Sequence, residues 1–370
     1  MPGCCNFSLF PACRVVKLRV LESFTQQLSA GQSLSADQAR LAAGQLADEI
    51  ISASAKADFL IALARKGETH EEIAAFAAAL REKSLPPPIE KNWRAARGIL
   101  DIVGTGGDRL GTFNISTTSA IVCAAAGVAV AKHGNRAVTS QSGSADVLEA
   151  LGIRIDLTPA EAARSLQERN FAFFFAPNFH PAFKHLASAR KLCAERGQRT
   201  IFNFLGPLLN PAHPSAMLVG VARAELCEPL ARVLQSLGVR RAMVVTGKIG
   251  NRKSEIGNSL DELSTLGENH IAEFYHARGF TTSILWLENF PLQPATLEDL
   301  LGGDKFQNAE ITRRILRGDE RGPKRDAVLL NAGAALFVAE ATRSLAEGWE
   351  LAGETIDSGK ATRKLAELAE

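Results

Sequence analysis

Residues 101–152, DIVGTGGDRLGTFNISTTSAIVCAAAGVAVAKHGNRAVTSQSGSADVLEALG, decide the fold of this chain. An apolar strand leads into a glycine-rich turn, a helix with a hydroxyl-rich start follows, and a second apolar strand ends in a basic loop. A strand, a helix and a second strand in this order are typical of a parallel α/β sheet. Both loops are suited to phosphate, and we therefore expect a ligand that carries phosphate at both ends.

Composition excludes several classes of protein. The chain has 370 residues, of which 46% are apolar and 22% charged, which is ordinary for a globular protein and enough for two domains. A net charge of +2 predicts no nucleic-acid-binding surface, and the longest apolar run, Ala120–Ala131, is too short to span a membrane. The six cysteines show no repeated spacing, which favours a reduced, cytoplasmic protein.

The pattern along the chain predicts an α/β fold class with a small all-helical N-terminal domain and a large α/β domain around a mostly parallel central sheet. Residues 1–17 are rich in cysteine and proline, and we expect a poorly ordered extension there. Residues 18–88 form the helical domain, with a further helical contribution from about 177–198, and residues 89–370 form the α/β domain. A capping-box pattern at Ser35–Gln38 opens one helix, and three prolines at 86–88 mark the linker.

The α/β region alternates between strand-like and helix-like runs. The expected strands are 100–103, 128–131, 171–175, 217–221 and 243–245. The expected helices are 116–126, 143–151, 159–169, 224–237, 307–317 and 324–342.

The glycine-rich turn, Gly104–Asp108, directly follows the first strand. Glycine lets the backbone approach a ligand, so that main-chain N–H groups line an anion. Asn114–Thr117 then begins a helix, whose free N–H groups also suit phosphate. The spacing matches neither a P-loop nor the dinucleotide-binding pattern. An ordinary tight turn with a helix cap remains the alternative for this stretch alone.

The basic loop, Lys132–Arg136, follows the second strand, with hydroxyls at Thr139, Ser140, Ser142 and Ser144. Parallel sheets bind ligands at the carboxyl ends of their strands, where both loops lie. A solvated basic loop is the alternative. His133 is a candidate general base, although a substrate contact or a structural role is equally compatible with the sequence.

Asp261 and Glu262 are adjacent carboxylates. Mg²⁺ binds hard oxygens, usually one or two carboxylates together with substrate phosphates. Neighbours on a straight strand point to opposite faces, so this pair could share a metal only on a turn or at a helix start. Taken alone, such a pair is typical of surface charge, and it indicates a metal site only because a polyphosphate substrate needs its charge neutralised.

The motifs GTGGD, NIST, KHGNR and SGSADVLEALG together resemble the anthranilate phosphoribosyltransferase family of tryptophan biosynthesis. The likeness continues through 176–185, 199–211, 260–263 and 329–339, and it covers nearly all of the chain from about residue 18. The resemblance implies a pentosyltransferase in which the amine of anthranilate attacks phosphoribosyl pyrophosphate, releasing pyrophosphate. It also implies a homodimer formed through the helical part, and a phosphoribosyl-pyrophosphate-binding domain over 89–370.

The resemblance also implies roles for individual residues. Contacts to phosphoribosyl pyrophosphate fall on Gly104, Gly107, Asp108, Thr112, Asn114, Ile115, Ser116, Thr117, Lys132, His133, Gly134, Asn135, Arg136, Ser140 and Ser144. Contacts to anthranilate fall on Gly104, His133, Asn135, Arg190 and Pro207. The Mg²⁺ ligands, for two ions per site, fall on Ser116, Asp261 and Glu262.

The chain departs from the family pattern at three places. Gln141 stands where the family usually has lysine. About three extra residues follow Arg190, so that counting back from Arg199 selects Cys193 as the anthranilate contact instead; we prefer Arg190, since a thiol cannot pair with a carboxylate through two hydrogen bonds. The segment 247–261 is longer than usual, with Lys248, Arg252 and Lys253 inserted, and it is either a lid over pyrophosphate or solvated surface.

Two other functions fit parts of the sequence. A pyrimidine nucleoside phosphorylase would share the fold and the glycine turn, but it would not need the Asp261–Glu262 pair. A non-catalytic relative that binds nucleic acid would share the fold, but the near-neutral charge and the intact NIST and KHGNR motifs argue against it.

Overall fold

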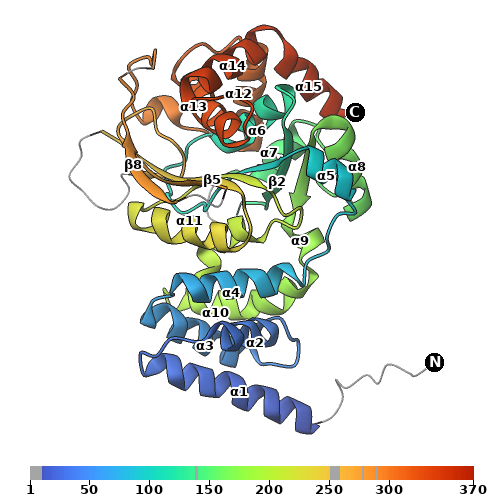
Figure 1. Cartoon of the computed structure of the whole chain (residues 1–370), viewed down its shortest axis with the longest axis vertical. Helices are drawn as coiled ribbons and strands as arrows, with labels where there is room; N and C mark the ends of the chain where they lie inside the picture. Colours follow the sequence, from blue (N-terminus) through green and yellow to red (C-terminus); the bar gives the residue numbers. More distant parts are fainter. Residues whose placement is uncertain (1–10, 138–140, 251–258, 277–278, 289) are drawn as a thin grey trace. The chain divides into compact units, whose positions relative to one another are not determined.

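The computed structural model describes residues 11–137, 141–250, 259–276, 279–288 and 290–370 (Figure 1). The chain divides into two compact units. The helical unit consists of Met1–Ser84 and His180–Leu209, and the α/β unit consists of Leu85–Phe179 and Asn210–Glu370. The second helical segment therefore runs to Leu209, beyond the residues 177–198 that the sequence suggests.

The helical unit contains four long helices in its first segment and shorter ones in its second. They are α1 (Pro11–Ser29), α2 (Ala36–Leu46), α3 (Ala53–Lys66), α4 (His70–Arg81), η2 (Pro181–Leu186), α10 (Ala187–Glu195), η3 (Ile201–Asn203) and η4 (Gly206–Leu209). The capping box at Ser35 is confirmed, because the Ser35 side chain accepts from Gln38 N while the Gln38 side chain accepts from Ser35 N. Helix α1 already begins at Pro11, so the expectation of a poorly ordered extension over 1–17 is wrong for residues 11–17. No proline or glycine interrupts the chain between Pro11 and Ser29, which allows the helix to extend.

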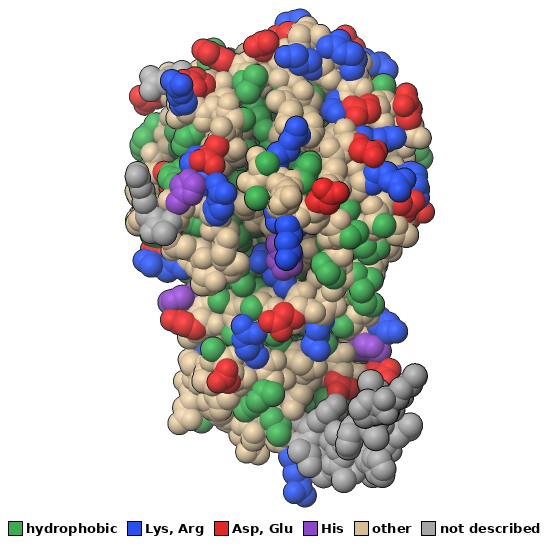
Figure 2. All heavy atoms as spheres, turned by 45° about the vertical axis from the view of Figure 1, so that its right-hand side comes forward, with side chains coloured by type: hydrophobic (Ala, Val, Ile, Leu, Met, Phe, Trp, Pro, Cys, Tyr) green, Lys and Arg blue, Asp and Glu red, His purple; other side chains and the backbone are tan. Residues whose placement is uncertain are grey.

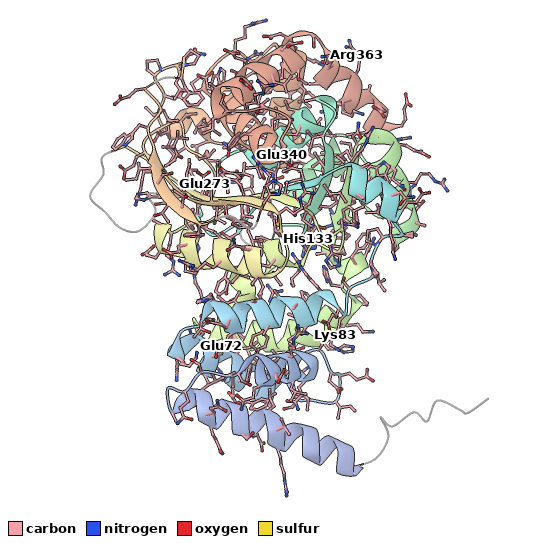
Figure 3. All side chains as sticks on the ribbon, viewed as in Figure 1. Glu72, Lys83, His133, Glu273, Glu340 and Arg363 are labelled. Atoms are coloured by element: carbon pink, nitrogen blue, oxygen red, sulfur yellow. The ribbon has the colours of Figure 1, made fainter. Side chains whose placement is uncertain are left out.

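Two buried cations tie the helical unit together. The Lys56 ammonium donates to the carbonyl of Asp48 at 2.6 Å and to that of His185 at 2.8 Å, which joins the two segments of the unit. The Lys66 ammonium contacts Glu72, whose carboxylate also accepts the N–H of Leu34 (Figure 3). Buried charges are tolerated only with partners of this kind.

In the part of the α/β unit that the structure describes, eight strands form one sheet. Its strands are β1 (Ile99–Gly104), β2 (Ala129–Gly134), β3 (Phe171–Phe175), β4 (Ala216–Gly220), β5 (Arg241–Lys248), β6 (Ser259–Leu260), β7 (Asn269–Tyr275) and β8 (Thr281–Leu285). Its helices are α5 (Lys91–Ala96), α6 (Ile115–Ala125), α7 (Ser144–Ala150), α8 (Pro159–Arg169), α9 (Ala176–Phe179), η5 (Ala224–Leu226), α11 (Cys227–Ser236), η6 (Glu298–Leu300), α12 (Lys305–Arg317), α13 (Pro323–Val338), α14 (Leu345–Asp357) and α15 (Lys360–Ala369).

The sheet order is β3-β2-β1-β4-β5-β7-β8, with β6 paired to β5 off this path. Strands β1 to β5 pair in parallel, which confirms the mostly parallel sheet. Strands β7 and β8 are antiparallel and were not predicted. Strand β8 is largely exposed, so it lacks the apolar run that marked the buried strands.

Both faces of the parallel strands are covered. Leu100, Ile102 and Val130 face a core shared with α6 and α13, whereas Ile99 and Ala131 face a smaller core that includes Leu166 of α8. Figure 1 shows α6, α12, α13 and α14 on one side of the sheet and α11 on the other. Alternating residues of each strand therefore bury on opposite faces, and the polar groups gather where the strands end.

Among the described residues, no helix is long and apolar enough to cross a membrane.

Candidate functional site

The glycine turn after β1 holds a carboxylate. Asp261 Oδ2 accepts hydrogen bonds from the N–H groups of Gly106 and Gly107, the latter at 3.2 Å. Gly106 has φ +71°, a conformation that favours glycine, and it turns the two N–H groups toward the same point. The turn therefore presents two N–H donors to one oxygen atom, which in this structure is Asp261 Oδ2.

Glycines at the strand ends bring the acidic pair into place. Gly104 and Gly220 are paired at the carboxyl ends of β1 and β4. A Cβ on Gly220 would lie 1.6 Å from the carbonyl oxygen of Asp261, and one on Gly104 would lie 3.0 Å from it. Asp261 and Glu262 follow the two-residue strand β6 on a bend, which is the turn geometry that the sequence analysis requires for a shared metal.

Glu262 reaches the start of helix α6. Its Oε1 accepts the N–H of Ser116 at 3.3 Å, and the Lys132 ammonium lies 3.4 Å from Ser116 Oγ. Lys132 also donates to the carbonyl of Ile102 at 2.7 Å. The predicted metal ligands Ser116, Asp261 and Glu262 are thus brought to the ends of β1 and β2, with Lys132 as the nearby cation.

The acidic side chains of this site are difficult to ionise together. Burial raises the pKa of Asp261 well above its usual range, and the charges of Asp108 and Glu262 raise it further. Burial raises the pKa of Glu262 to about 7, although the Lys132 ammonium opposes the shift. A divalent cation would relieve this repulsion.

The residues fit Mg²⁺ only if the substrate completes the coordination. Among the residues that the structure describes, no three His, Cys, Asp or Glu side chains form a ready metal site. Mg²⁺, however, commonly takes one or two carboxylates and obtains its other oxygens from substrate phosphates and water. Asp261, Glu262 and the Ser116 hydroxyl supply a donor set of this kind.

A buried polar network supports the site from beneath, and the sequence analysis did not identify it. Asp101 in β1 accepts the N–H of His133 at 3.3 Å and the side-chain amide of Asn210 at 2.8 Å. Asn210 also donates to the carbonyl of Ala131 at 2.7 Å. Burial raises the pKa of Asp101 to about 6, while Lys132 and Asn210 lower it in part. A lone carboxylate within the apolar strand ILDIV was the available signal.

The remaining predicted contacts to the sugar phosphate lie around these strand ends, with their side chains in different roles. Ile115 and Thr117 are buried, and the N–H of Ile115 already donates to the carbonyl of Phe113 at 2.7 Å. The Asn114 amide reaches the carbonyl of Ser142 at 3.5 Å, and Thr112 pairs with Leu301 in an isolated bridge. His133 is buried at the carboxyl end of β2 (Figure 3).

The basic loop is only partly described. Ser144 Oγ donates to the carbonyl of Asn135 at 3.4 Å, and the Arg136 guanidinium contacts Asp146 and Glu149. Gln141 is exposed. The predicted contacts Thr139 and Ser140 lie outside the described residues, as do the inserted Arg252 and Lys253.

Arg190 and Pro207 belong to the helical unit. Arg190 is exposed on α10, with its guanidinium 5.7 Å from the centre of the Phe202 ring, and Pro207 is buried in η4. Cys193, the alternative position, is buried and its thiol lies 3.8 Å from the carbonyl of Ala57. Of the two, only Arg190 presents its side chain to solvent.

On the face of the molecule drawn in Figure 2, basic and acidic side chains are interspersed.

Family models match both parts of the chain. Residues 22–84 match the helical bundle domain of a glycosyl transferase family, and residues 96–362 match the a/b domain of the same family. Among curated proteins, the anthranilate phosphoribosyltransferase of Lacticaseibacillus paracasei is 50% identical over 327 residues, covering 87% of this chain and 89% of that protein. That of Symbiobacterium thermophilum is 45% identical over 350 residues, covering 95% and 97%.

Solved structures show the same likeness. Anthranilate phosphoribosyltransferase from Thermus thermophilus superposes with a TM-score of 0.82 at 41% identity, covering 94% of this chain and 98% of that chain. The enzyme from Saccharomyces cerevisiae in complex with PRPP and Mg superposes with a TM-score of 0.79 at 28% identity, covering 97% of both chains. A structure of the yeast enzyme with 4-fluoroanthranilate gives a TM-score of 0.81 at 27% identity, covering 95% and 97%.

Proposed function

The chain belongs to the anthranilate phosphoribosyltransferase family, and from this premise we propose that it transfers the phosphoribosyl group of phosphoribosyl pyrophosphate to the amine of anthranilate. The products are N-(5-phosphoribosyl)anthranilate and pyrophosphate, in the second step of tryptophan biosynthesis from chorismate. The observation that carries this proposal is the gathering of Ser116, Lys132, Asp261 and Glu262 at the carboxyl ends of neighbouring strands.

Asp261 and Glu262 would lie at the pyrophosphate end of the substrate. Ser116, Asp261 and Glu262 would hold Mg²⁺, and the bound metal would offset the negative charge that builds up on departing pyrophosphate. The yeast relative has been solved with PRPP and Mg, which supports the use of Mg²⁺; two ions per site are part of the proposal. The N–H groups of Gly106 and Gly107 already bind a carboxylate, so they are competent donors to an anionic oxygen.

The ribose phosphate would lie against the start of α6 and the Lys132–Arg136 loop. The free N–H groups at the start of an α-helix attract phosphate, and Lys132 adds a full positive charge. The other contacts implied by the resemblance, Ser140 among them, are part of this proposal, with the exception of Arg136, whose side chain is paired with carboxylates.

The nucleophile needs positioning more than deprotonation. An aromatic amine is neutral at pH 7 and attacks C1 directly, and holding it there supplies much of the rate. Arg190 would bind the anthranilate carboxylate through two parallel hydrogen bonds, and Gly104, His133, Asn135 and Pro207 would complete the contacts. His133 is proposed as a substrate contact and not as the essential base.

The direct test is to mix the pure protein with anthranilate, phosphoribosyl pyrophosphate and Mg²⁺ and to follow the loss of anthranilate fluorescence. We expect turnover that stops when EDTA is added and resumes with excess Mg²⁺. Fluorescence that stays constant at all Mg²⁺ concentrations would overturn the proposal.

A pyrimidine nucleoside phosphorylase is not favoured, because the similar curated proteins are anthranilate phosphoribosyltransferases and the Asp261–Glu262 carboxylates lie in the site. Incubation with thymidine and inorganic phosphate should therefore release no free base. The nucleic-acid-binding alternative is disfavoured by the net charge of +2.

The proposed function also leads us to propose an oligomeric state and a cellular location. We propose a homodimer, which size-exclusion chromatography with light scattering would detect. We also propose a cytoplasmic location, because the described cysteines Cys123, Cys193 and Cys227 are all free thiols.

A further inference from the structure

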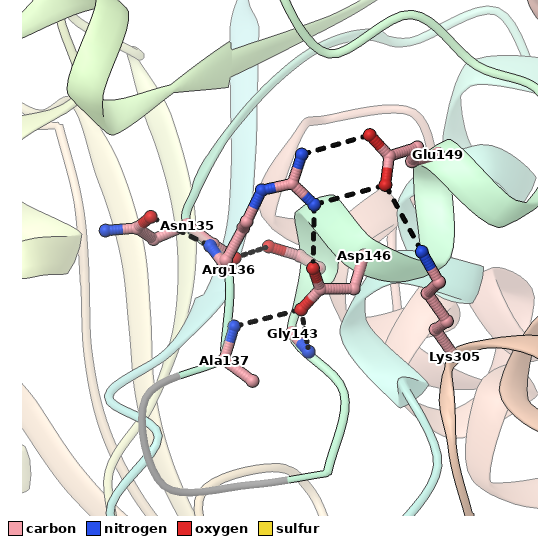
Figure 4. Close-up of polar contacts among 8 residues, drawn as sticks. Asn135, Arg136, Ala137, Gly143, Asp146, Glu149 and Lys305 are labelled. Atoms are coloured by element: carbon pink, nitrogen blue, oxygen red, sulfur yellow. Dashed lines mark hydrogen bonds and ion pairs between the residues drawn. The ribbon is translucent and has the colours of Figure 1, made fainter.

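Arg136 of the basic loop is held by carboxylates of helix α7 (Figure 4). Its Nη1 donates to Asp146 Oδ1 at 2.9 Å and to Glu149 Oε2 at 3.1 Å, and its Nη2 donates to Glu149 Oε1 at 3.0 Å. Lys305 of α12 lies 3.5 Å from the same Glu149 carboxylate. Two cations therefore face two carboxylates, so the cluster presents no net positive charge to a phosphate.

Asp146 uses its other oxygen to join two separate points of the chain. Oδ2 accepts the N–H of Ala137 and the N–H of Gly143, both at 3.0 Å. Asp146 is the interior member of the cluster, because its side chain is 16% exposed whereas that of Arg136 is 44% exposed. Exposed ion pairs contribute little by themselves, but a carboxylate that accepts two backbone N–H groups as well as a guanidinium fixes the geometry of all three.

The backbone near Ala137 and the backbone near Gly143 are packed closely together. A Cβ on Gly143 would lie 2.4 Å from Ala137 N and 2.8 Å from Asn135 O, so no side chain fits at position 143. A Cβ on Gly134 would lie 2.3 Å from Ser144 Oγ. The start of α7 and the end of β2 are thus in direct contact. Asp146 links the two segments by accepting the N–H groups of Ala137 and Gly143.

We propose that Arg136 and Asp146 are positioning residues for phosphoribosyl pyrophosphate, forming a clamp that holds Asn135 and Ser144 in place, and that Arg136 is not itself a phosphate ligand. This inference rests on the proposed function, and it departs from the resemblance, which assigns Arg136 to the substrate. Asn135 of the KHGNR motif and Ser144 at the start of α7 remain proposed substrate contacts, whereas Nη1 and Nη2 of Arg136 donate to the carboxylates of Asp146 and Glu149.

The test is a double-mutant cycle on the affinity for phosphoribosyl pyrophosphate. We expect Asp146→Ala and Arg136→Ala each to raise the KM for this substrate about tenfold, the effect of one charge-assisted hydrogen bond. The KM for anthranilate should stay within about twofold. The double variant should be hardly worse than either single variant, because both remove the same clamp.

If Arg136 bound the substrate phosphate directly, the variants would show a different pattern of KM changes. The Arg136→Ala loss would exceed the Asp146→Ala loss, the two effects would multiply, and Arg136→Lys would retain most of the affinity because it retains the charge. Any of these results overturns the clamp. The clamp instead predicts that Arg136→Lys resembles Arg136→Ala, since lysine cannot contact two carboxylates in the same fork.

The matched control is Arg154, which also faces two carboxylates, Asp156 and Glu161, on the α/β unit. Arg154→Ala should leave both KM values at the parental level. Asp146→Asn keeps an acceptor for the two backbone N–H groups and should lose less than Asp146→Ala, which keeps the test decisive if the alanine variant unfolds. If the parent protein turns over the substrates and every variant keeps the parental KM, the clamp is rejected but the proposed function stands. If the parent protein shows no turnover, the proposed function is rejected and the clamp with it.

Discussion

Asp261 combines two roles that no other described side chain of the α/β unit shares. It binds the N–H groups of the glycine turn, and it lies beside Asp108 and Glu262, whose charges raise its pKa. Such a carboxylate is stable as an anion only when a cation is present. This arrangement supports the proposal of a metal–phosphate complex at the site, in which side-chain acid–base chemistry is secondary.

The first prediction follows from this arrangement. Replacing the two carboxylates proposed to bind the metal, Asp261→Asn with Glu262→Gln, should lower kcat/KM by about 10²–10³, the usual effect of losing pre-organised charge stabilisation. His133→Ala should lower it less than tenfold. Steady-state kinetics at saturating Mg²⁺ measures both values. The reverse order would show that His133 performs the decisive proton transfer.

The second prediction concerns the aromatic substrate. Arg190→Ala should raise the KM for anthranilate about tenfold or more, because two charge-assisted hydrogen bonds to the carboxylate are lost. The KM for phosphoribosyl pyrophosphate should stay within twofold. Lys191→Ala, at the neighbouring exposed position on α10, is the control and should change neither value. An unchanged anthranilate KM in Arg190→Ala would mean that the alignment across residues 191–196 is wrong.

Individual helices and strands could be predicted from the sequence where capping residues or glycines mark their ends. The capping box at Ser35 and the glycine turn after β1 were visible because each depends on a few adjacent residues. The clamp at Asp146 was not visible, because it depends on which way Arg136 turns in three dimensions. Strand β8 was missed because an exposed strand lacks the apolar run that marks buried ones, whereas β7 is mostly buried and His270 and Glu273 interrupt its apolar residues.

Helices α13 and α14 depend on glycine for their close packing, which gives the third prediction. A Cβ on Gly348 would lie 2.2 Å from the carbonyl oxygen of Gly333, so Gly348→Ala should destabilise the protein by about 1–3 kcal/mol through overpacking. Gly353 in the same helix has open space around it, its nearest neighbour being 3.9 Å away. Gly353→Ala should therefore be neutral or stabilising by up to about 1 kcal/mol. Urea unfolding of both variants compares the two effects, and equal losses would contradict this account of the packing.

At the scale of the whole molecule, the chain crosses between its two units at Ser84, His180 and Leu209, so each unit folds from segments far apart in sequence. The sequence predicted both kinds of unit from periodicity, and it missed how far the second helical segment extends. The short 3₁₀ turns η3 and η4 carry no long amphipathic pattern, which explains why the segment beyond residue 198 was not recognised.

We expect His180, where the chain re-enters the helical unit, to make the stability of the protein sensitive to acid. His180 is buried against Phe183, and burial lowers its pKa to about 4, although a hydrogen bond with the Leu209 backbone partly opposes the shift. An unfolded histidine has a pKa near 6.5, so between about pH 6.5 and 4 the unfolded chain takes up a proton that the folded chain does not. Stability should therefore fall as the pH drops through this window, by up to about 3 kcal/mol from this group.

The fourth prediction isolates that contribution. His180→Phe keeps the ring stacked on Phe183 but cannot take up a proton, so its free energy of unfolding should depend less steeply on pH between 6.5 and 4 than that of the parent. Urea unfolding at several pH values measures the slope. His70→Ala, at an exposed histidine of α4, is the control and should retain the parental slope. If His180→Phe and the parent lose stability in parallel, the acid sensitivity of the molecule originates elsewhere, and the buried position of His180 contributes packing alone.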